Sequence, residues 1–145
     1  MIRIRAATPN DFEPAALLLR EARLPLDGFR EHMGHVLIAS RADAVVGCVA
    51  LEIYENAALF RSLAVAPEFR GQGLGELLTS EALRLARESR VHDVYLLTET
   101  AVKFFPRFGF TIEERAAAPA PIQQSVEFRT ACPASAVFMH ARIDG

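Results

Sequence analysis

The sequence predicts an α/β fold in which a mixed sheet is built around a central meander of strands. Two tight turns separate three consecutive β-type segments, 35–40, 44–54 and 58–65. A glycine-rich loop and a long segment with helical periodicity, 74–89, come next. A short apolar run typical of a buried strand, 94–98, follows that helix. With the outer elements added, the predicted order is β-α-α-β-β-β-α-β-α-β-α-β.

Capping residues and helix-breaking residues predict where the outer helices begin and end. Thr8 as N-cap, Pro9 at the first position and Asp11 in the first turn begin a helix that runs to about Ala22. Gly109 ends a short helix as a C-cap glycine. The other expected segments are strands at 2–5, 110–114 and 134–141 and helices at 26–32, 101–108 and 122–128.

The composition indicates a single domain, residues 1–145, with enough apolar residues (51%) to bury a sizeable core. The net charge of −2 argues against non-specific nucleic-acid binding. No apolar stretch approaches the roughly 18–20 residues that cross a membrane. The alternating N-terminus lacks the apolar block of a signal peptide, so we expect a cytoplasmic protein. Cys48 and Cys132 form no ligand pattern with the histidines, and no metal site is expected.

The glycine-rich loop is the most informative segment. Gly71, Gly73 and Gly75 lie between the strand end at 63–65 and the helix at 74–89. Glycines leave the backbone N–H groups accessible, and the helix start adds the positive end of its dipole, so the loop predicts a pyrophosphate site. An ordinary structural turn is the alternative. The helix is expected to bury one apolar face, made of Leu74, Leu77, Leu78, Ala82 and Leu85.

These elements and motifs, in this order, resemble the GNAT superfamily of acyl-CoA-dependent N-acyltransferases. Residues 70–75, Arg-Gly-Gln-Gly-Leu-Gly, match the family's Q/R-x-x-G-x-G/A signature in full, and residues 101–110 resemble its later A-x-x-F-Y-x-x-x-G-F block. The resemblance covers nearly the whole chain. It implies a mostly antiparallel central sheet flanked by helices on both faces, and acetyl-CoA as the donor.

The resemblance implies a role for each residue at the donor end. Backbone amides from Gln72 to Gly75 would bind the CoA pyrophosphate, and the strand at 63–65 would pair with pantetheine through its main chain. The amide near Val65 would polarise the thioester carbonyl as an oxyanion donor. Phe105 stands where the family has the tyrosine that protonates the leaving thiolate, so no general acid is assigned. The cofactor-binding residues are then Leu63, Ala64, Val65, Arg70, Gly71, Gln72, Gly73, Leu74, Gly75, Thr98 and Phe105.

The acceptor end is predicted from a charged pair in apolar strands. Glu52 is the candidate base for the acceptor amine, acting through water, and Arg61 is its expected partner across the hairpin. The pair is either a cross-strand salt bridge or functional, and the two can coexist. Leu59, Arg61, Leu63 and Val65 are expected on one face of the strand. An arginine there is costly unless it meets an anion, which predicts a small anionic amino acid as acceptor.

Thr98 and Thr100 are further candidates for the acceptor pocket, with helix capping as the alternative for both. Residues 59–65, 95–100 and 132–137 and the Phe104-Phe105 pair are similar to arsenic-resistance-type N-acetyltransferases, which are associated with the glutamate analogue arsinothricin. The Leu-Leu-Thr strand end and the Phe-Phe pair are also similar to the acetyltransferase domain of N-acetylglutamate synthases. Both resemblances imply glutamate-like acceptors.

The sequence therefore predicts an acetyltransferase in which the acceptor amine attacks acetyl-CoA directly in a ternary complex. A protein or peptide N-acetyltransferase, a non-catalytic acyl-CoA sensor suggested by Phe105, and a nucleotide binder of another fold are the alternatives. The apolar final strand, 136–139, permits pairing of two copies into a homodimer.

Overall fold

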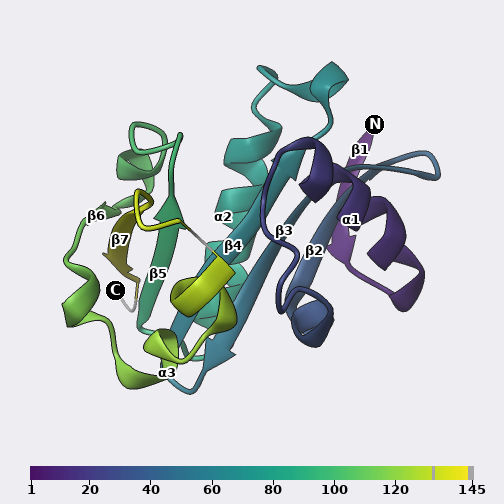
Figure 1. The fold of residues 1–145 in the computed structure, drawn as a ribbon. Helices are drawn as coiled ribbons and strands as arrows, with labels where there is room; N and C mark the ends of the chain where they lie inside the picture. The colour runs from purple at the N-terminus through teal and green to yellow at the C-terminus, as the bar shows by residue number, and fades with distance from the viewer. Residues whose placement is uncertain (132, 144–145) are drawn as a thin grey trace.

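In the computed structural model, residues 1–131 and 133–143 are described, apart from the side chains of Thr130 and Ala131. They form one seven-stranded sheet in the order β1-β2-β3-β4-β5-β7-β6 (Figure 1). The strands are β1 Ile2–Ala6, β2 Val36–Arg41, β3 Ala44–Tyr54, β4 Ala57–Val65, β5 Asp93–Thr98, β6 Thr111–Ile112 and β7 Val137–Arg142. All neighbours pair antiparallel except β4 and β5, which are parallel. The predicted mixed, mostly antiparallel sheet is confirmed.

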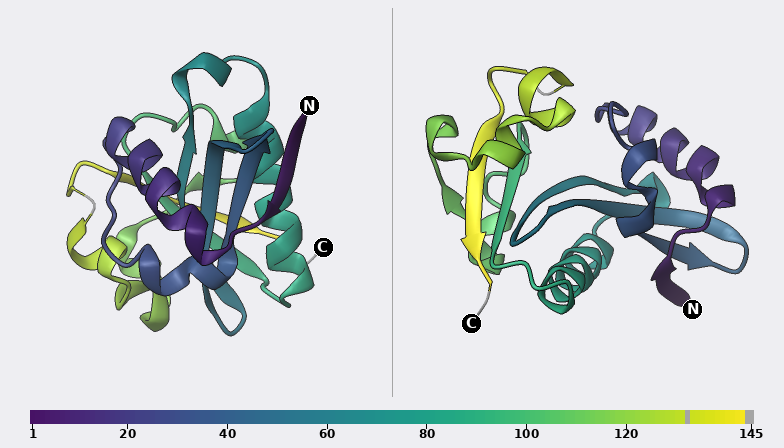
Figure 2. Two further views of the ribbon diagram at one scale, coloured as in Figure 1. Left: turned by 90° about the vertical axis from the view of Figure 1, so that its right-hand side faces the viewer. Right: turned by 90° about the horizontal axis from the view of Figure 1, so that it is seen from below.

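Helices cover both faces of the sheet, as expected. The α-helices are α1 Phe12–Glu21, α2 Leu74–Glu88 and α3 Ala120–Gln123. Helices α1 and α2 pack against β3 and β4 from opposite sides, and α3 packs on β4 (Figure 2). Among the described residues, no helix is long and apolar enough to cross a bilayer.

The start of α1 follows the sequence prediction. Thr8 and Asp11 form a capping box, and the first turn, Pro9–Asp11, is a 3-10 helix. The Asp11 carboxylate also accepts hydrogen bonds from Arg5, 2.7 Å from Nη1 to Oδ2. These bonds, chiefly the one from Arg5, lower the pKa of Asp11 to about 2.

Several predicted boundaries are wrong, and breakers explain most of them. The helix expected at 26–32 is a 3-10 helix at Arg30–His35, because Gly28 adopts a φ of +77°. The helix expected at 101–108 is helical only at Phe105–Phe108, where Pro106 has no N–H to donate. The segment 122–128 is divided between α3 and a π-helical turn, Glu127–Ala131. The strand expected at 110–114 is two residues long. Cys132 lies outside the described residues.

The buried face of α2 is rotated from the predicted one. Leu77 is 48% exposed, and Leu85 is only partly buried. Thr79 is buried instead, because its hydroxyl donates to the Gly75 backbone oxygen at 2.8 Å. The buried residues of α2 are Leu74, Leu78, Thr79, Ala82, Leu83 and Ala86.

A β-bulge in β4 corrects the predicted strand face. Arg61 lies opposite Ala50, but Ala64 lies opposite Cys48, so β4 has one extra residue there. Ser62 takes a left-handed φ of +62° at this point. The extra residue reverses the alternation: Leu59 and Arg61 share one face, whereas Leu63 and Val65 lie on the other. The single face predicted for all four side chains is therefore wrong.

The bulge also marks the place where β4 and β5 separate. Their parallel pairing extends only from Ala57 and Asp93 to Phe60 and Leu96. Beyond this point β5 continues to Thr98 on β7, and β4 continues to Val65 on β3. The two halves of the sheet therefore splay apart, as the view from below shows (Figure 2).

We expect Ser62→Val to destabilise the protein. A β-branched side chain at this left-handed φ costs about 1–2 kcal/mol, which lowers the melting temperature by a few degrees in thermal unfolding. Ser62→Gly is the matched control, since it also loses the hydroxyl but tolerates the backbone conformation. Equal melting temperatures for the two variants would contradict the bulge.

Candidate active site

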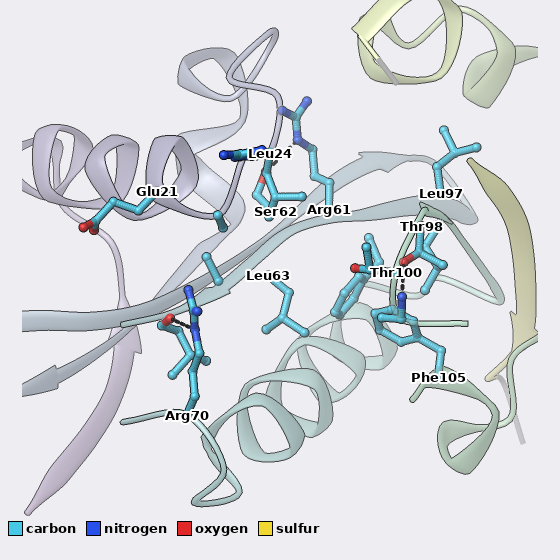
Figure 3. Close-up of a pocket in the computed structure, with 17 residues that line it drawn as sticks. Glu21, Leu24, Arg61, Ser62, Leu63, Arg70, Leu97, Thr98, Thr100 and Phe105 are labelled. Atoms are coloured by element: carbon cyan, nitrogen blue, oxygen red, sulfur yellow. Dashed lines mark hydrogen bonds between the residues drawn. The ribbon is translucent and has the colours of Figure 1, made fainter. Parts of the chain in front are cut away.

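Three adjoining cavities form one cleft through the splayed sheet. The central cavity, about 410 Å³, lies between β4 and β5 (Figure 3). A second, about 500 Å³, shares Leu24, Thr98 and Thr100 with it and continues toward the loop after α1. A third, also about 500 Å³, shares Leu63 and Thr100 and continues toward the start of α2. Two molecules can therefore enter from opposite ends and meet between the strands.

The glycine loop at the α2 end is built to bind an anion. Among the backbone hydrogen bonds that lie outside the helices and strands of the described chain, none is donated by an N–H group of residues 71–75. Gly73 is the N-cap of α2 with a φ of +84°, a conformation that favours glycine. These N–H groups stand at the positive end of a 15-residue helix. The loop thus has the free donors that a pyrophosphate needs.

The edge of β4 borders the central cavity. Ala66 N–H donates to Val46 of β3 at 2.8 Å, so Val65, one residue earlier, presents its backbone groups to the opposite side, the cleft. Arg70 lines the same cavity and donates from Nε to the Val65 oxygen at 3.0 Å. An extended ligand arm can pair with this edge as an added strand.

The β5 side supplies hydroxyls and an aromatic wall. Thr98 and Thr100 both line the cleft. The Thr98 hydroxyl also accepts the Ala101 N–H at 3.0 Å, so it caps the following turn while keeping a proton to donate. Phe105 lines the central cavity and is otherwise packed edge-on against Phe60, with ring centroids 5.5 Å apart.

Arg61 and Glu52 are brought together, but diagonally. Glu52 lies opposite Leu59 and Arg61 opposite Ala50 on one face of the sheet, and Arg61 Nη1 donates to Glu52 Oε2 at 2.7 Å. The predicted cross-strand salt bridge is confirmed.

The Arg61 side chain is fully buried within protein contacts. Nη2 donates to the Pro25 oxygen at 3.2 Å, and Nε lies 3.0 Å from Ser62 Oγ and 3.3 Å from Glu127 Oε1. The loop after α1 packs closely on this cluster, since a Cβ at Gly28 would lie 3.3 Å from Arg61 Nη1. The protein itself therefore supplies the anion that Arg61 requires, and the expectation that the acceptor must supply it is wrong.

Glu52 is sequestered with Arg61. Its side chain is 2% exposed, and its Oε1 accepts the Tyr54 hydroxyl at 2.5 Å. Burial alone would raise the pKa of Glu52, but the hydrogen bonds from Tyr54 and Arg61 outweigh it and lower that pKa. A carboxylate with a lowered pKa is a weak base, and Glu52 lines none of the three cavities. Its position is that of a structural counter-ion.

Sequence reasoning missed Glu127. It comes from the π-helical turn after α3, and its side chain is 4% exposed. Burial raises the pKa of Glu127 to about 7, and the nearby Glu52 charge adds to this, against the opposing effect of Arg61. No local motif marks this residue, because only the fold brings residue 127 to residue 61.

Three other residues with reactive or charged side chains, Tyr54, Tyr95 and Arg107, lie apart from the cleft centre. The hydroxyl of Tyr54 is committed to Glu52, and Tyr95 stacks on Phe138 and His140, so neither tyrosine lines the cleft. Arg107 lies at the donor end, paired with Glu76 at 3.0 Å. No group of acidic, histidine or cysteine side chains in the described part of the chain could hold a metal ion.

Comparison with known proteins identifies the family. Residues 32–112 match the acetyltransferase (GNAT) domain. Over 104 residues the chain is 36% identical to an uncharacterized N-acetyltransferase of Chlorobaculum tepidum, an alignment that covers 71% of this chain and 64% of that protein. Over 119 residues it is 29% identical to an amino-acid acetyltransferase of Shewanella oneidensis, covering 81% of this chain and 26% of that protein.

The fold has close solved neighbours. It superposes on N-acetylglutamate synthase of Neisseria gonorrhoeae, solved with coenzyme A and N-acetyl-glutamate, with a TM-score of 0.84 at 20% identity. That superposition covers 99% of this chain and 35% of the synthase. The chain therefore spans about a third or less of the amino-acid acetyltransferase and of the synthase.

A sheet that opens between two parallel strands, beside a helix start with free N–H donors, defines a protein that holds a phosphorylated donor along a strand edge. The chain belongs to the GNAT acetyltransferase family. Its loop 70–75 fits coenzyme A, the group present in several of the solved neighbours.

Removing the Arg61 charge should destabilise the fold strongly. Arg61→Met leaves the buried carboxylates of Glu52 and Glu127 without a cation, an effect of about 3–5 kcal/mol. Urea unfolding measures it. The triple variant Arg61→Met, Glu52→Gln, Glu127→Gln removes all three charges and should recover much of the loss. If Arg61→Met were as stable as wild type, the ion cluster would not form in solution.

The contribution of Glu127 to the stability of the wild type should fall as the pH rises from about 5 to about 8. The folded-state pKa of Glu127, about 7, lies above its usual value of 4.5, so the folded state binds more protons between these values. Its contribution is full below pH 4.5 and is lost as the pH rises through 7. Glu127→Gln should flatten this dependence in urea unfolding, whereas exposed Glu114→Gln should not. Equal slopes in all three proteins would refute the assignment.

Proposed function

We propose that this chain, as a single domain of residues 1–145, transfers the acetyl group of acetyl-CoA to the amine of a small anionic amino acid such as glutamate. The observation that carries the proposal is the continuous cleft. Its donor end has the free amides of residues 71–75, and its other end opens beside Thr98 and Thr100. Both substrates can therefore be bound at once, and the amine attacks the thioester directly.

The donor is held by backbone groups of this chain. The amides from Gln72 to Gly75 bind the pyrophosphate, and Arg70 adds positive charge. The edge of β4 at Leu63, Ala64 and Val65 pairs with pantetheine, and Phe105 and Thr98 complete the wall. The amide of Val65, which faces the cleft, stabilises the oxyanion that forms on the thioester carbonyl.

The acceptor class is supported by the relatives. Several are amino-acid acetyltransferases, and one solved neighbour holds N-acetyl-glutamate. Arsinothricin, the arsenic-containing glutamate analogue, falls in the same class, so the resemblance to arsenic-resistance enzymes stays a prediction within this proposal. Thr98 and Thr100 offer hydroxyls to the acceptor, while Arg61 and Glu52 hold the wall behind it as positioning residues.

Proton transfer needs no buried catalytic group. The attacking amine loses its proton to water or to the exposed carboxylates that line the cleft, Asp27 and Glu99. The tetrahedral intermediate collapses as the C–S bond breaks, and the CoA thiolate takes a proton from water. This accounts for a phenylalanine at position 105.

Steady-state kinetics test the proposal. Thiol release from acetyl-CoA is measured against glutamate, phosphinothricin, arsinothricin, spermidine and a histone-like peptide. We expect activity with the anionic amino acids alone, and intersecting double-reciprocal lines when both substrates are varied, as a ternary complex requires.

One control variant and three outcomes show how the proposal could fail. Gly73→Val disfavours the left-handed conformation of the N-cap, so it should weaken CoA binding. The hydrogen-bond donors elsewhere in the fold should be unaffected. Activity with the peptide or spermidine alone would show that the acceptor is not an anionic amino acid. Parallel lines would indicate an acetyl-enzyme, and tight CoA binding without any transfer would favour an acyl-CoA sensor.

A further inference from the structure

Arg23 stands at the C-terminus of α1 in a position that usually holds glycine. The Arg23 N–H donates to the Arg20 oxygen at 3.1 Å, and the Leu24 N–H donates to the Leu19 oxygen at 2.9 Å. These two bonds form a Schellman motif in which Arg23 is the left-handed residue, with a φ of +58°. The motif fixes the backbone of Arg23 at the mouth of the cleft.

Arg23 lines both the central cavity and the cavity at the acceptor end. Leu24, its neighbour in the chain, lies above β4 beside Arg61 and Ser62 (Figure 3). Within residues 1–131 and 133–143, the Arg23 side chain has no hydrogen bond or ion pair, and it is exposed. It is therefore a free cation located where the two cavities join.

The other arginines of the central cavity have partners. The Arg61 side chain is fully buried against Glu52 and Glu127, and Arg70 Nε is bound to the Val65 oxygen at the donor end. In the lining of the acceptor-end cavity, Arg23 is the single basic residue, whereas Asp27 and Glu99 are acidic. An acceptor that carries both an ammonium and a carboxylate group matches this combination of charges.

We propose that Arg23 binds the carboxylate adjacent to the reacting amine of the acceptor, and so selects α-amino acids over simple amines. This inference rests on the proposed function and names the residue that fixes its acceptor class. The carboxylate is the one beside the amine because Arg23 also lines the cavity in which the thioester lies. The planar guanidinium can bind it with two hydrogen bonds.

The chain contains a matched control for Arg23. Arg90 follows α2 in the same motif, with its N–H on the Arg87 oxygen at 3.0 Å and the Val91 N–H on the Ala86 oxygen at 2.9 Å. Its φ is +64°, it is exposed, and it lines none of the three cavities. Arg23→Gly and Arg90→Gly therefore remove the same charge from the same backbone conformation, and glycine suits that conformation.

The experiment compares glutamate with its two amides in the wild type and both variants. Arg23→Gly should raise the KM for glutamate roughly 10- to 100-fold, the range for a lost charge-assisted pair, with the KM for acetyl-CoA unchanged. Isoglutamine, whose α-carboxylate is an amide, should be poor with the wild type and as good as glutamate with Arg23→Gly. Glutamine keeps the α-carboxylate and should follow the pattern of glutamate. Arg90→Gly should match the wild type throughout.

Binding of N-acetyl-L-glutamate in the presence of CoA, measured by calorimetry, separates the two proposals. If the wild type acetylates no amino acid but binds this probe more tightly than Arg23→Gly does, the proposed function fails and the carboxylate site at Arg23 stands. If transfer to glutamate occurs and Arg23→Gly leaves its KM and the rejection of isoglutamine unchanged, the assignment of Arg23 is overturned and the function stands. Equal binding to both proteins, or none to either, also overturns it.

Discussion

Both ends of the cleft depend on one extra residue in β4, at Ser62. A regular strand would place Arg61, Leu63 and Val65 on one face. Because the bulge reverses the alternation, the strand presents Arg61 to the side of α1 and α3, and Leu63 and Val65 to the side of α2. Pairing with β5 ends at the same place. The opening between the strands and the separation into a donor end and an acceptor end therefore have one local cause.

Burial of Arg61 is compensated entirely inside the protein. A lone buried cation is costly, but Glu52 and Glu127 offset its charge, and Ser62 and Pro25 accept its remaining hydrogen bonds. The cluster joins β3, β4, the loop after α1 and the turn after α3. Since a second carboxylate shares the guanidinium, little positive field remains for a ligand. The anionic acceptor that we propose must then be attracted by the exposed rim of the cleft.

The sequence was sufficient where the signal is local. Turns, caps and alternation are patterns of neighbouring residues. They were enough to predict the three central strands, the start of α2 and the Arg61–Glu52 pair. The bulge was not predicted, because a serine at a left-handed φ carries no sequence mark and only its pairing with β3 reveals it. Glu127 and Arg23 were missed for a related reason: each acts through residues distant in sequence that the fold brings close.

Phe105 has a place both in the hydrophobic core and in the cleft. Phe105 packs edge-on against Phe60, Phe104 and Phe110, so its ring is part of the core as well as the wall of the cleft. A tyrosine at this position would add a proton donor, and its ring would pack in the same way. Under the proposed function, the leaving thiolate then takes its proton from water that reaches the open cleft. In the proposed reaction, catalysis depends mainly on holding the amine against a polarised thioester, which is the contribution that backbone amides and a fixed strand edge can supply.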